Sequence, residues 1–203
     1  MTNKRLRQDW VPPGQSRVLP SRNRVVLLAF GASIPGRWGQ PSDSIAHAIE
    51  RLSKLGLVLL RRSANYSTPP LGFVRQGRYV NAVASFKADI APGQLLRALK
   101  QLEREAGRRP GLRWGPRPLD VDILDMGGRT IGYRGRRKPQ RLAGRLQLPH
   151  PEMANRGFVL VPLAEVAPGW RHPIDGWTAM ERLNRVPALA RGIYRIPMQP
   201  PRS

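Results

Sequence analysis

The stretch RWGPRPLDVDILDMG, residues 113–127, is the most informative part of this chain. It places Asp120 and Asp122 one residue apart in an otherwise apolar run over 119–125, in a chain with 35 Lys and Arg against only 13 Asp and Glu. Such a run is typical of a buried strand. Because residues i and i+2 of a strand point to the same face, the spacing predicts that both carboxylates project together while their apolar neighbours face the core.

Working outward from this strand, the hydrophobic pattern predicts five further elements. Apolar runs or strict alternation predict strands, and apolar residues three or four apart predict helices. The strands are expected at 25–31, 57–67, 78–89 and 119–125, and the helices at 42–55 and 92–106. The order strand, helix, strand, strand, helix, strand predicts an α+β fold, an α/β sandwich with a ferredoxin-like βαββαβ core. Its sheet is expected to be mainly antiparallel, with helices packed on one face.

Length and composition indicate one globular domain. The 203 residues with 40% hydrophobic content are sufficient for a proper core. We expect a flexible basic arm at 1–23, a single domain over 24–196 with a basic loop insert at 127–145, and a disordered tail at 197–203. No apolar stretch could cross a bilayer and the first residues lack a secretory core, so we expect a soluble, cytoplasmic protein. An Arg-rich organelle leader stays open. The absence of cysteine excludes disulfides and thiolate metal sites.

The net charge of +22 indicates an anionic partner, which could be nucleic acid, a nucleotide or another phosphate-rich molecule. The basic arm and the loop RTIGYRGRRKPQR, residues 129–141, would suit contacts with a phosphate backbone, and Tyr133 could stack on a base. No recognised nucleic-acid module is present in the sequence. A nucleic-acid-binding protein is therefore the alternative hypothesis.

The aspartate pair suggests a magnesium site. Two neighbouring carboxylates repel each other unless a cation lies between them, and Mg²⁺ prefers a few carboxylate oxygens, water and substrate phosphates. The pattern alone is short and common, so two exposed aspartates at a sheet edge would also fit. The surrounding residues favour a polyphosphate site, namely Arg108, Arg109, Arg113, Trp114 and Arg117. The segment GASIPGRW, residues 31–38, has the glycine spacing of a phosphate-binding P-loop but lacks its Lys-Ser/Thr pair.

Three other clusters have functional side chains. TPPLG, residues 68–72, predicts a rigid loop whose backbone could contact a flat heterocycle. Tyr79 and Asn81 share one strand face and offer a ring for stacking and an amide that both donates and accepts. LPHPEMANRGFVL, residues 148–160, contributes His150, Arg156 and Phe158, of which the first two suit phosphate contacts. A surface role for the histidine and a core role for the phenylalanine are the structural alternatives.

Together these motifs resemble the 6-hydroxymethyl-7,8-dihydropterin pyrophosphokinase family of the folate pathway. The family-like run R-W-G-P-R-P-L-D-V-D-I-L is joined in order by S-T-P-P-L-G, Y-x-N, E-x-x-x-G-R and P-H-P-x-M-x-x-R-x-F. The resemblance spans about residues 25–170, most of the chain. It implies transfer of pyrophosphate from ATP to the pterin hydroxymethyl group with release of AMP. We expect a monomer that needs no nucleic acid or membrane, although the sequence itself does not give the oligomeric state.

The resemblance also assigns site residues. Asp120 and Asp122 are implied to hold two Mg²⁺ ions, and they act with Arg108 and Arg117 as the catalytic set. The implied ATP-binding residues are Glu103, Arg108, Trp114, Arg117, Ile123, Arg145, His150 and Arg156. The implied pterin-binding residues are Thr68, Pro70, Leu71, Gly72, Tyr79, Asn81 and Phe158.

The chain departs from the family pattern in three places. Gly31-Ala32-Ser33 and a following insert stand where the family usually has Gly-Ser-Asn after its first strand. The loop over 127–145 is longer and more basic than expected, and either Arg109 or Arg113 could fill the family's second arginine position. Because the magnesium ligands are retained, we expect an active enzyme, with an inactive paralogue as the alternative.

Overall fold

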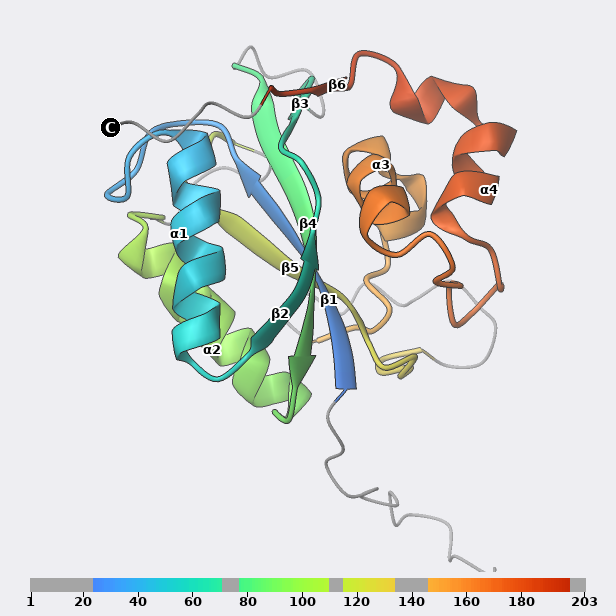
Figure 1. The fold of residues 1–203 in the computed structure, drawn as a ribbon, viewed down its shortest axis with the longest axis horizontal. Coiled ribbons are helices and arrows are strands. Elements are labelled where there is room, and N and C mark those ends of the chain that lie inside the picture. The colour runs from blue at the N-terminus through green and yellow to red at the C-terminus, as the bar shows by residue number, and fades with distance from the viewer. Residues whose placement is uncertain (1–23, 71–76, 110–114, 134–145, 198–203) are drawn as a thin grey trace, which may run out of the picture.

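An antiparallel β-sheet forms the centre of the protein (Figure 1). The computed structural model describes residues 24–70, 77–109, 115–133 and 146–197. Over these residues the strands are β1 (Arg24–Ala32), β2 (Val58–Arg62), β3 (Tyr66–Thr68), β4 (Tyr79–Ala88), β5 (Asp120–Met126) and β6 (Tyr194–Arg195). The order across the sheet is β5-β1-β4-β3-β6, with β2 also paired to β4, and every pairing is antiparallel.

Helices cover both faces of this sheet (Figure 1). The predicted helices α1 (Pro41–Lys54) and α2 (Pro92–Glu105) lie together on one face. The opposite face is covered by α3 (Gly157–Val166) and α4 (Ala179–Arg185), with 3₁₀ turns η1 (Met153–Asn155) and η2 (Pro187–Ala190). The α+β class and the ferredoxin-like core are confirmed. The expectation of helices on one face only was incomplete, because the C-terminal segment adds the second layer.

Two hydrophobic layers follow from the alternation of the strands. Leu28 and Phe30 of β1 and Phe86 of β4 pack under α1 and α2, whereas Leu27 and Val83 pack against α3. Because the central strands are buried on both faces, they are apolar almost throughout. This double burial holds the sheet rigid beneath any side chain that projects from β1, β4 or β5.

The predicted single strand over 57–67 was wrong in one respect, because the chain forms two short strands there. The pairing of β2 with β4 shifts register between Leu59 and Arg61. Beyond this shift, the hydroxyl of Ser63 accepts a hydrogen bond from the Val83 amide at 3.0 Å, which takes the place of a regular ladder bond. The chain then re-pairs with β4 further along, as β3.

Strand β5 presents the two aspartates as predicted. Val121 and Ile123 are buried in the layer under α1 and α2, while Asp120 and Asp122 project to the α3 side. Their partners across the β1 ladder are Gly31 and Ala29. The carboxylates therefore lie over small residues of β1, which leaves space above the sheet.

Several predicted segments fall outside the described residues, namely the arm 1–23, most of the insert (134–145) and residues 198–203. The domain boundaries accordingly stay a prediction. Within the described part of the chain, no helix is long and apolar enough to span a membrane.

Candidate active site

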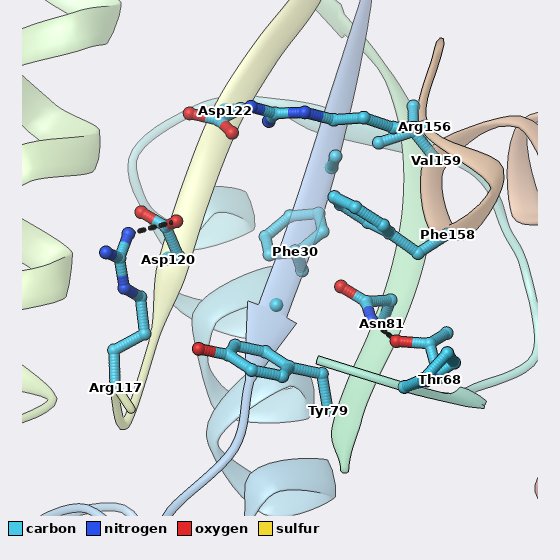
Figure 2. Close-up of a pocket in the computed structure, with 13 residues that line it drawn as sticks. Phe30, Thr68, Tyr79, Asn81, Arg117, Asp120, Asp122, Arg156, Phe158 and Val159 are labelled. Carbon is cyan, nitrogen blue, oxygen red and sulfur yellow. Dashed lines mark hydrogen bonds and ion pairs between the residues drawn. The ribbon is translucent and has the colours of Figure 1, made fainter. Parts of the chain in front are cut away.

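A cavity of about 90 Å³ opens on the α3 side of the sheet, above β1, β4 and β5 (Figure 2). Its walls combine aromatic rings, amide and hydroxyl groups, and charged side chains. The lining residues are Ala29, Phe30, Gly31, Thr68, Pro69, Tyr79, Asn81, Arg117, Asp120, Asp122, Arg156, Phe158 and Val159. We call it the aromatic cavity. It brings together residues that are up to 130 positions apart in the sequence, from Ala29 to Val159.

The polar end of the aromatic cavity is a fixed amide–hydroxyl pair. Asn81 is buried and its Nδ2 donates to Oγ1 of Thr68 at 2.7 Å (Figure 2). A Cβ added at Gly31 would lie 3.0 Å from Oδ1 of Asn81, so the glycine makes room for the amide. Because the hydrogen bond to Thr68 fixes the amide, its remaining hydrogen-bonding capacity points in a defined direction.

Tyr79 connects the aromatic cavity with the segment that precedes β5. Its hydroxyl donates to the carbonyl of Gly115 at 2.9 Å, and Nε of Arg117 donates to the same carbonyl at 3.3 Å. Arg117 is also clamped by Ser33, whose Oγ accepts from the Arg117 amide at 3.1 Å and whose amide donates to the Arg117 carbonyl at 2.9 Å. The cavity ring and the arginine are thus held by one short backbone segment.

The segment after β1 is a packed connection that supports Arg117, and it is not a phosphate-binding P-loop. A Cβ at Gly36 would lie 2.5 Å from the carbonyl oxygen of Ala106 and 2.6 Å from Cβ of Pro118. The Arg37 amide also donates to the Ala106 carbonyl at 3.0 Å. The segment therefore packs tightly between the end of α2 and the residues before β5, where it supports Arg117.

Asp120 is neutralised by two arginines. Its Oδ1 accepts from Nη1 of Arg108, and its Oδ2 accepts from Nη1 of Arg117 at 2.6 Å. Burial alone would raise the pKa of Asp120, but the charges of Arg108 and Arg117 outweigh it and hold that pKa below its ordinary value. Asp120 is therefore ionised in the folded protein.

Asp122 has a different environment two residues further on. Its side chain is 36% exposed, and Nε2 of His150 lies 3.8 Å from its Oδ2, a pair that is ionic only when the imidazole is protonated. Burial, followed by repulsion from Asp120, raises the pKa of Asp122 to about 6. Arg156 extends toward Asp122 from the start of α3 (Figure 2), and its charge partly offsets that rise. The Asp122 carboxylate is thus under-compensated and open to a cation.

Behind Asp120, Glu103 of α2 forms a buried anchor. Its side chain is 2% exposed and accepts from Nζ of Lys100 at 2.7 Å, Nη1 of Arg108 at 2.6 Å and the amide of Val121 at 2.9 Å. Burial raises the pKa of Glu103 in spite of Lys100. The same carboxylate therefore fixes β5 and orients Arg108 toward Asp120.

A second cavity of about 260 Å³ lies on the other side of Asp122. Its lining residues are Leu96, Lys100, Val121, Asp122, Ile123, Leu146, Gln147, His150 and Pro151. Burial and the charge of Arg156 lower the pKa of His150 to about 4, so its imidazole is neutral near pH 7 and can donate or accept. We call it the second cavity. Asp122 borders both cavities.

The residues predicted from sequence differ in where the structure places them. Those that line the aromatic cavity are Thr68, Tyr79, Asn81, Arg117, Asp120, Asp122, Arg156 and Phe158. Ile123 and His150 line the second cavity, and Glu103 and Arg108 stand behind Asp120. Pro70 is half-buried but does not line either cavity; its neighbour Pro69 does. Leu71, Gly72, Arg113, Trp114 and Arg145 lie outside the described residues, and Arg109 is exposed.

Sequence reasoning missed several lining residues. Ala29 was recognised only as part of a strand, and Gly31 only as the end of that strand and the start of the loop that departs from the family pattern, although the small size of both creates the space over β1. Lys100 gave no signal, because one lysine in a chain this basic looks like surface charge. A search for i, i+3 and i+4 partners of Glu103 would have pointed to it.

The donors suit a hard cation that completes its shell with other oxygens. Within the described ranges, no group of three or more His, Cys, Asp or Glu side chains could hold a metal ion by itself. Two carboxylates at i and i+2 are what Mg²⁺ uses when substrate phosphates and water supply the remaining ligands. Acids and arginines between two cavities are the groups with which an enzyme that transfers phosphate-containing groups binds metal and phosphate oxygens.

Comparison with known proteins identifies the family to which the chain belongs. The model of the 7,8-dihydro-6-hydroxymethylpterin-pyrophosphokinase (HPPK) family matches residues 27–168, and the chain belongs to this family. A 2-amino-4-hydroxy-6-hydroxymethyldihydropteridine pyrophosphokinase of Pseudomonas aeruginosa is 39% identical over 175 residues, 85% of this chain and 96% of that protein. The protein of the same name from Synechocystis is 35% identical over 172 residues, 84% of this chain and 80% of that protein.

Solved structures agree on the fold. A Plasmodium falciparum HPPK-DHPS triple mutant superposes with a TM-score of 0.64 at 14% identity, over 86% of this chain and 48% of that one. At this identity the likeness concerns the fold alone. The chain spans about half the length of that structure.

Proposed function

We propose that this chain transfers the pyrophosphoryl group of ATP to the hydroxymethyl group of 6-hydroxymethyl-7,8-dihydropterin and releases AMP. Membership of the HPPK family and the names of the relatives support this activity. The observation that carries the proposal is the place of Asp122, which borders the aromatic cavity on one side and the second cavity on the other. A transfer between two substrates needs such a shared boundary.

The aromatic cavity is the proposed pterin site. Tyr79 and Phe158 supply rings for a flat heterocycle, and the locked amide of Asn81, supported by Thr68, can read its edge. Pro69 lines this wall, Pro70 stands next to it in the chain, and Leu71 and Gly72, which lie outside the described residues, are proposed to contribute to the same site. Polar and aromatic groups together are what a small polar heterocycle requires for orientation.

The second cavity is the proposed nucleotide site. Apolar residues with Ile123 among them suit a base, and His150 suits phosphate oxygens. Arg156, which lines the aromatic cavity and extends toward Asp122, is proposed to contact the phosphates at the boundary of the two cavities. Arg108 and Arg117 flank the path between the cavities and are proposed to bind the phosphate chain, with Glu103 orienting the first of them. Trp114 and Arg145 are proposed nucleotide contacts from segments outside the described residues.

Asp120 and Asp122 are the proposed ligands of two magnesium ions. The under-compensated carboxylate of Asp122 fits this role directly, whereas Asp120 must release one arginine contact to bind a metal. Magnesium bound there would neutralise phosphate oxygens and make the β-phosphorus more electrophilic. The fit of the donor set, two oxygens beside an anion-binding region, supports the assignment.

In the proposed reaction the pterin hydroxyl oxygen forms a bond with the β-phosphorus of ATP. The bond between this phosphorus and the oxygen bridging to the α-phosphorus breaks, AMP leaves with that oxygen, and the hydroxyl proton passes to solvent. The protein's residues hold the ring and the phosphate chain so that attack is in line, and the arginines stabilise charge on the transferred group. Positioning therefore accounts for most of the expected acceleration.

We further propose a cytoplasmic monomer that requires no nucleic acid. The comparisons do not favour the nucleic-acid-binding alternative. Asp120 pairs with both flanking arginines, and Asp122 lies at the boundary of the two cavities, which supports an active enzyme over an inactive paralogue. The net charge of +22 then helps attract an anionic nucleotide.

The test is an assay for AMP release with four mixtures: with and without the pterin alcohol, and with and without Mg²⁺. We expect AMP only when ATP, pterin alcohol and Mg²⁺ are all present, together with the pterin pyrophosphate ester by mass spectrometry. AMP release at the same rate with and without the pterin alcohol, or no AMP release in any mixture, would contradict the proposal.

A further inference from the structure

Lys100 is a charged group of the second cavity that the sequence motifs did not single out. It lies on α2 one turn before Glu103, and its side chain is 41% exposed. Leu96, one turn earlier on the same helix, lines the same cavity. The helix therefore presents an apolar side chain and an ammonium group side by side to the proposed nucleotide site.

Lys100 is well placed to act as an anion contact. Among the described residues that line the second cavity, it has the one permanent positive charge. Its ammonium group carries three donors, and the structure gives it one hydrogen bond, to Oε1 of Glu103 at 2.7 Å. Glu103 is 2% exposed and holds the lysine from behind, while the exposed part of the side chain faces the cavity.

The charge of Lys100 also acts on both proposed metal ligands. It lowers the pKa values of Asp120 and Asp122, after burial and nearer charges have acted on each. Lys100 and Asp122 line the same second cavity, so a phosphate chain held there by a cation at Asp122 would have this lysine in its surroundings. A flexible point charge is suited to a chain whose oxygens change position during transfer.

We propose that Lys100 binds a phosphate oxygen of the nucleotide in the second cavity. This inference rests on the proposed function, because it takes the second cavity as the nucleotide site. It assigns a phosphate contact to α2, separate from the arginines that pair with Asp120. Lys100 is thus a binding residue and does not merely hold Glu103 in place.

The test compares Lys100→Gln with Arg97→Gln, a matched control that removes one exposed charge from the same helix. Dissociation constants are measured by calorimetry with Mg²⁺ for ATP, for adenosine, which has no phosphate, and for tripolyphosphate, which has no base. In Lys100→Gln we expect about tenfold weaker binding of ATP and tripolyphosphate, the effect of one hydrogen bond to a charged group, and unchanged binding of adenosine. Arg97→Gln should bind all three like the wild type.

Two further readouts separate contact from structure. Lys100→Arg should recover most of the ATP affinity, and in turnover Lys100→Gln should raise the KM for ATP with little change in kcat. Equal weakening for adenosine and ATP, or an unchanged ATP dissociation constant, would overturn the role of Lys100. Absence of AMP formation by the wild-type protein would instead overturn the proposed function, so the two failures are distinguishable.

Discussion

The two neighbouring aspartates are predicted to affect stability in opposite directions, although both are needed for activity. Two arginines stabilise the ionised form of Asp120. Burial and the negative charge of Asp120 destabilise the ionised form of Asp122. We therefore compare Asp120→Asn with Asp122→Asn, two isosteric changes that each remove one negative charge. The matched pair isolates the environment of each carboxylate from its size.

The expected magnitudes follow from the contacts. Asp120→Asn weakens two charge-assisted hydrogen bonds worth about 1.5–3 kcal/mol each, and since the amide keeps one acceptor the free energy of unfolding should fall by about 2–3 kcal/mol. For Asp122, a pKa of about 6 against an ordinary 3.8 means that ionisation destabilises the folded state. Its side chain is 36% exposed, so solvent screening reduces the gain in Asp122→Asn to about 1 kcal/mol.

The pH dependence of unfolding independently tests whether each carboxylate stabilises or destabilises the folded state. The folded protein holds the Asp122 proton more tightly than the unfolded chain does, so wild-type stability falls as pH rises from about 4 to about 6. The advantage of Asp122→Asn should be complete above that window and vanish near its lower end. The pKa of Asp120 is lowered, so its stabilisation persists at mildly acidic pH and is lost only below the unfolded value of about 3.9.

Urea unfolding at pH 8 and pH 5 without divalent cations, followed by tryptophan fluorescence, measures both differences. AMP release with Mg²⁺ and both substrates should be abolished or nearly so in both variants. If Asp122→Asn proved as destabilising as Asp120→Asn, the assignment of a neutralised and an under-compensated carboxylate would be wrong. Full activity in either variant would refute the proposed metal site.

Three other changes probe the scaffold around the site. Gly31→Ala places a methyl group 3.0 Å from the Asn81 amide oxygen, so the overpacking cost of about 1–3 kcal/mol should appear as weaker pterin binding at unchanged ATP affinity, measured by calorimetry. Ser33→Ala removes one hydrogen bond to Arg117 and should lower stability by about 1 kcal/mol and raise the KM for ATP, with rescue by Ser33→Thr. Glu165 of α3 accepts hydrogen bonds from the Tyr66 hydroxyl at 2.7 Å and from the Ala64 amide. Glu165→Ala removes both bonds and should lower the free energy of unfolding, measured in urea, by about 2 kcal/mol.

Sequence periodicity predicted the core elements because each has a clear local cause. The apolar face of α2 follows directly from burial on one side, and Pro92 and Gly107 mark the ends of the helical segment. In β4 the alternation divides the side chains between the two buried faces of the sheet. The second helical layer could not be predicted in this way. Residues 157–166 are apolar apart from Glu165 and contain Pro162, so they show no helical stripe.

The site was partly visible in the sequence for a similar reason. Asp120 and Asp122 were detectable because carboxylates are unexpected in an apolar strand. The difference in their electrostatic environments could not be detected, because it depends on Arg108, just after α2, and on His150 from a distant segment. The space above β1 was equally hidden, because small residues in a strand give no local signal of a cavity.

The ion pairs around Asp120 form a row of alternating charge that explains how the site stays stable before its substrates bind. Lys100, Glu103, Arg108, Asp120 and Arg117 follow one another from the second cavity to the aromatic cavity, each paired with the next. Such a row keeps every buried charge compensated while the site holds no phosphate. If metal binds at Asp122 and then draws on Asp120, an arginine loses its carboxylate partner at the moment when phosphate oxygens arrive to replace it. Metal and nucleotide binding should therefore reinforce each other, because each supplies the charge partner that the other displaces.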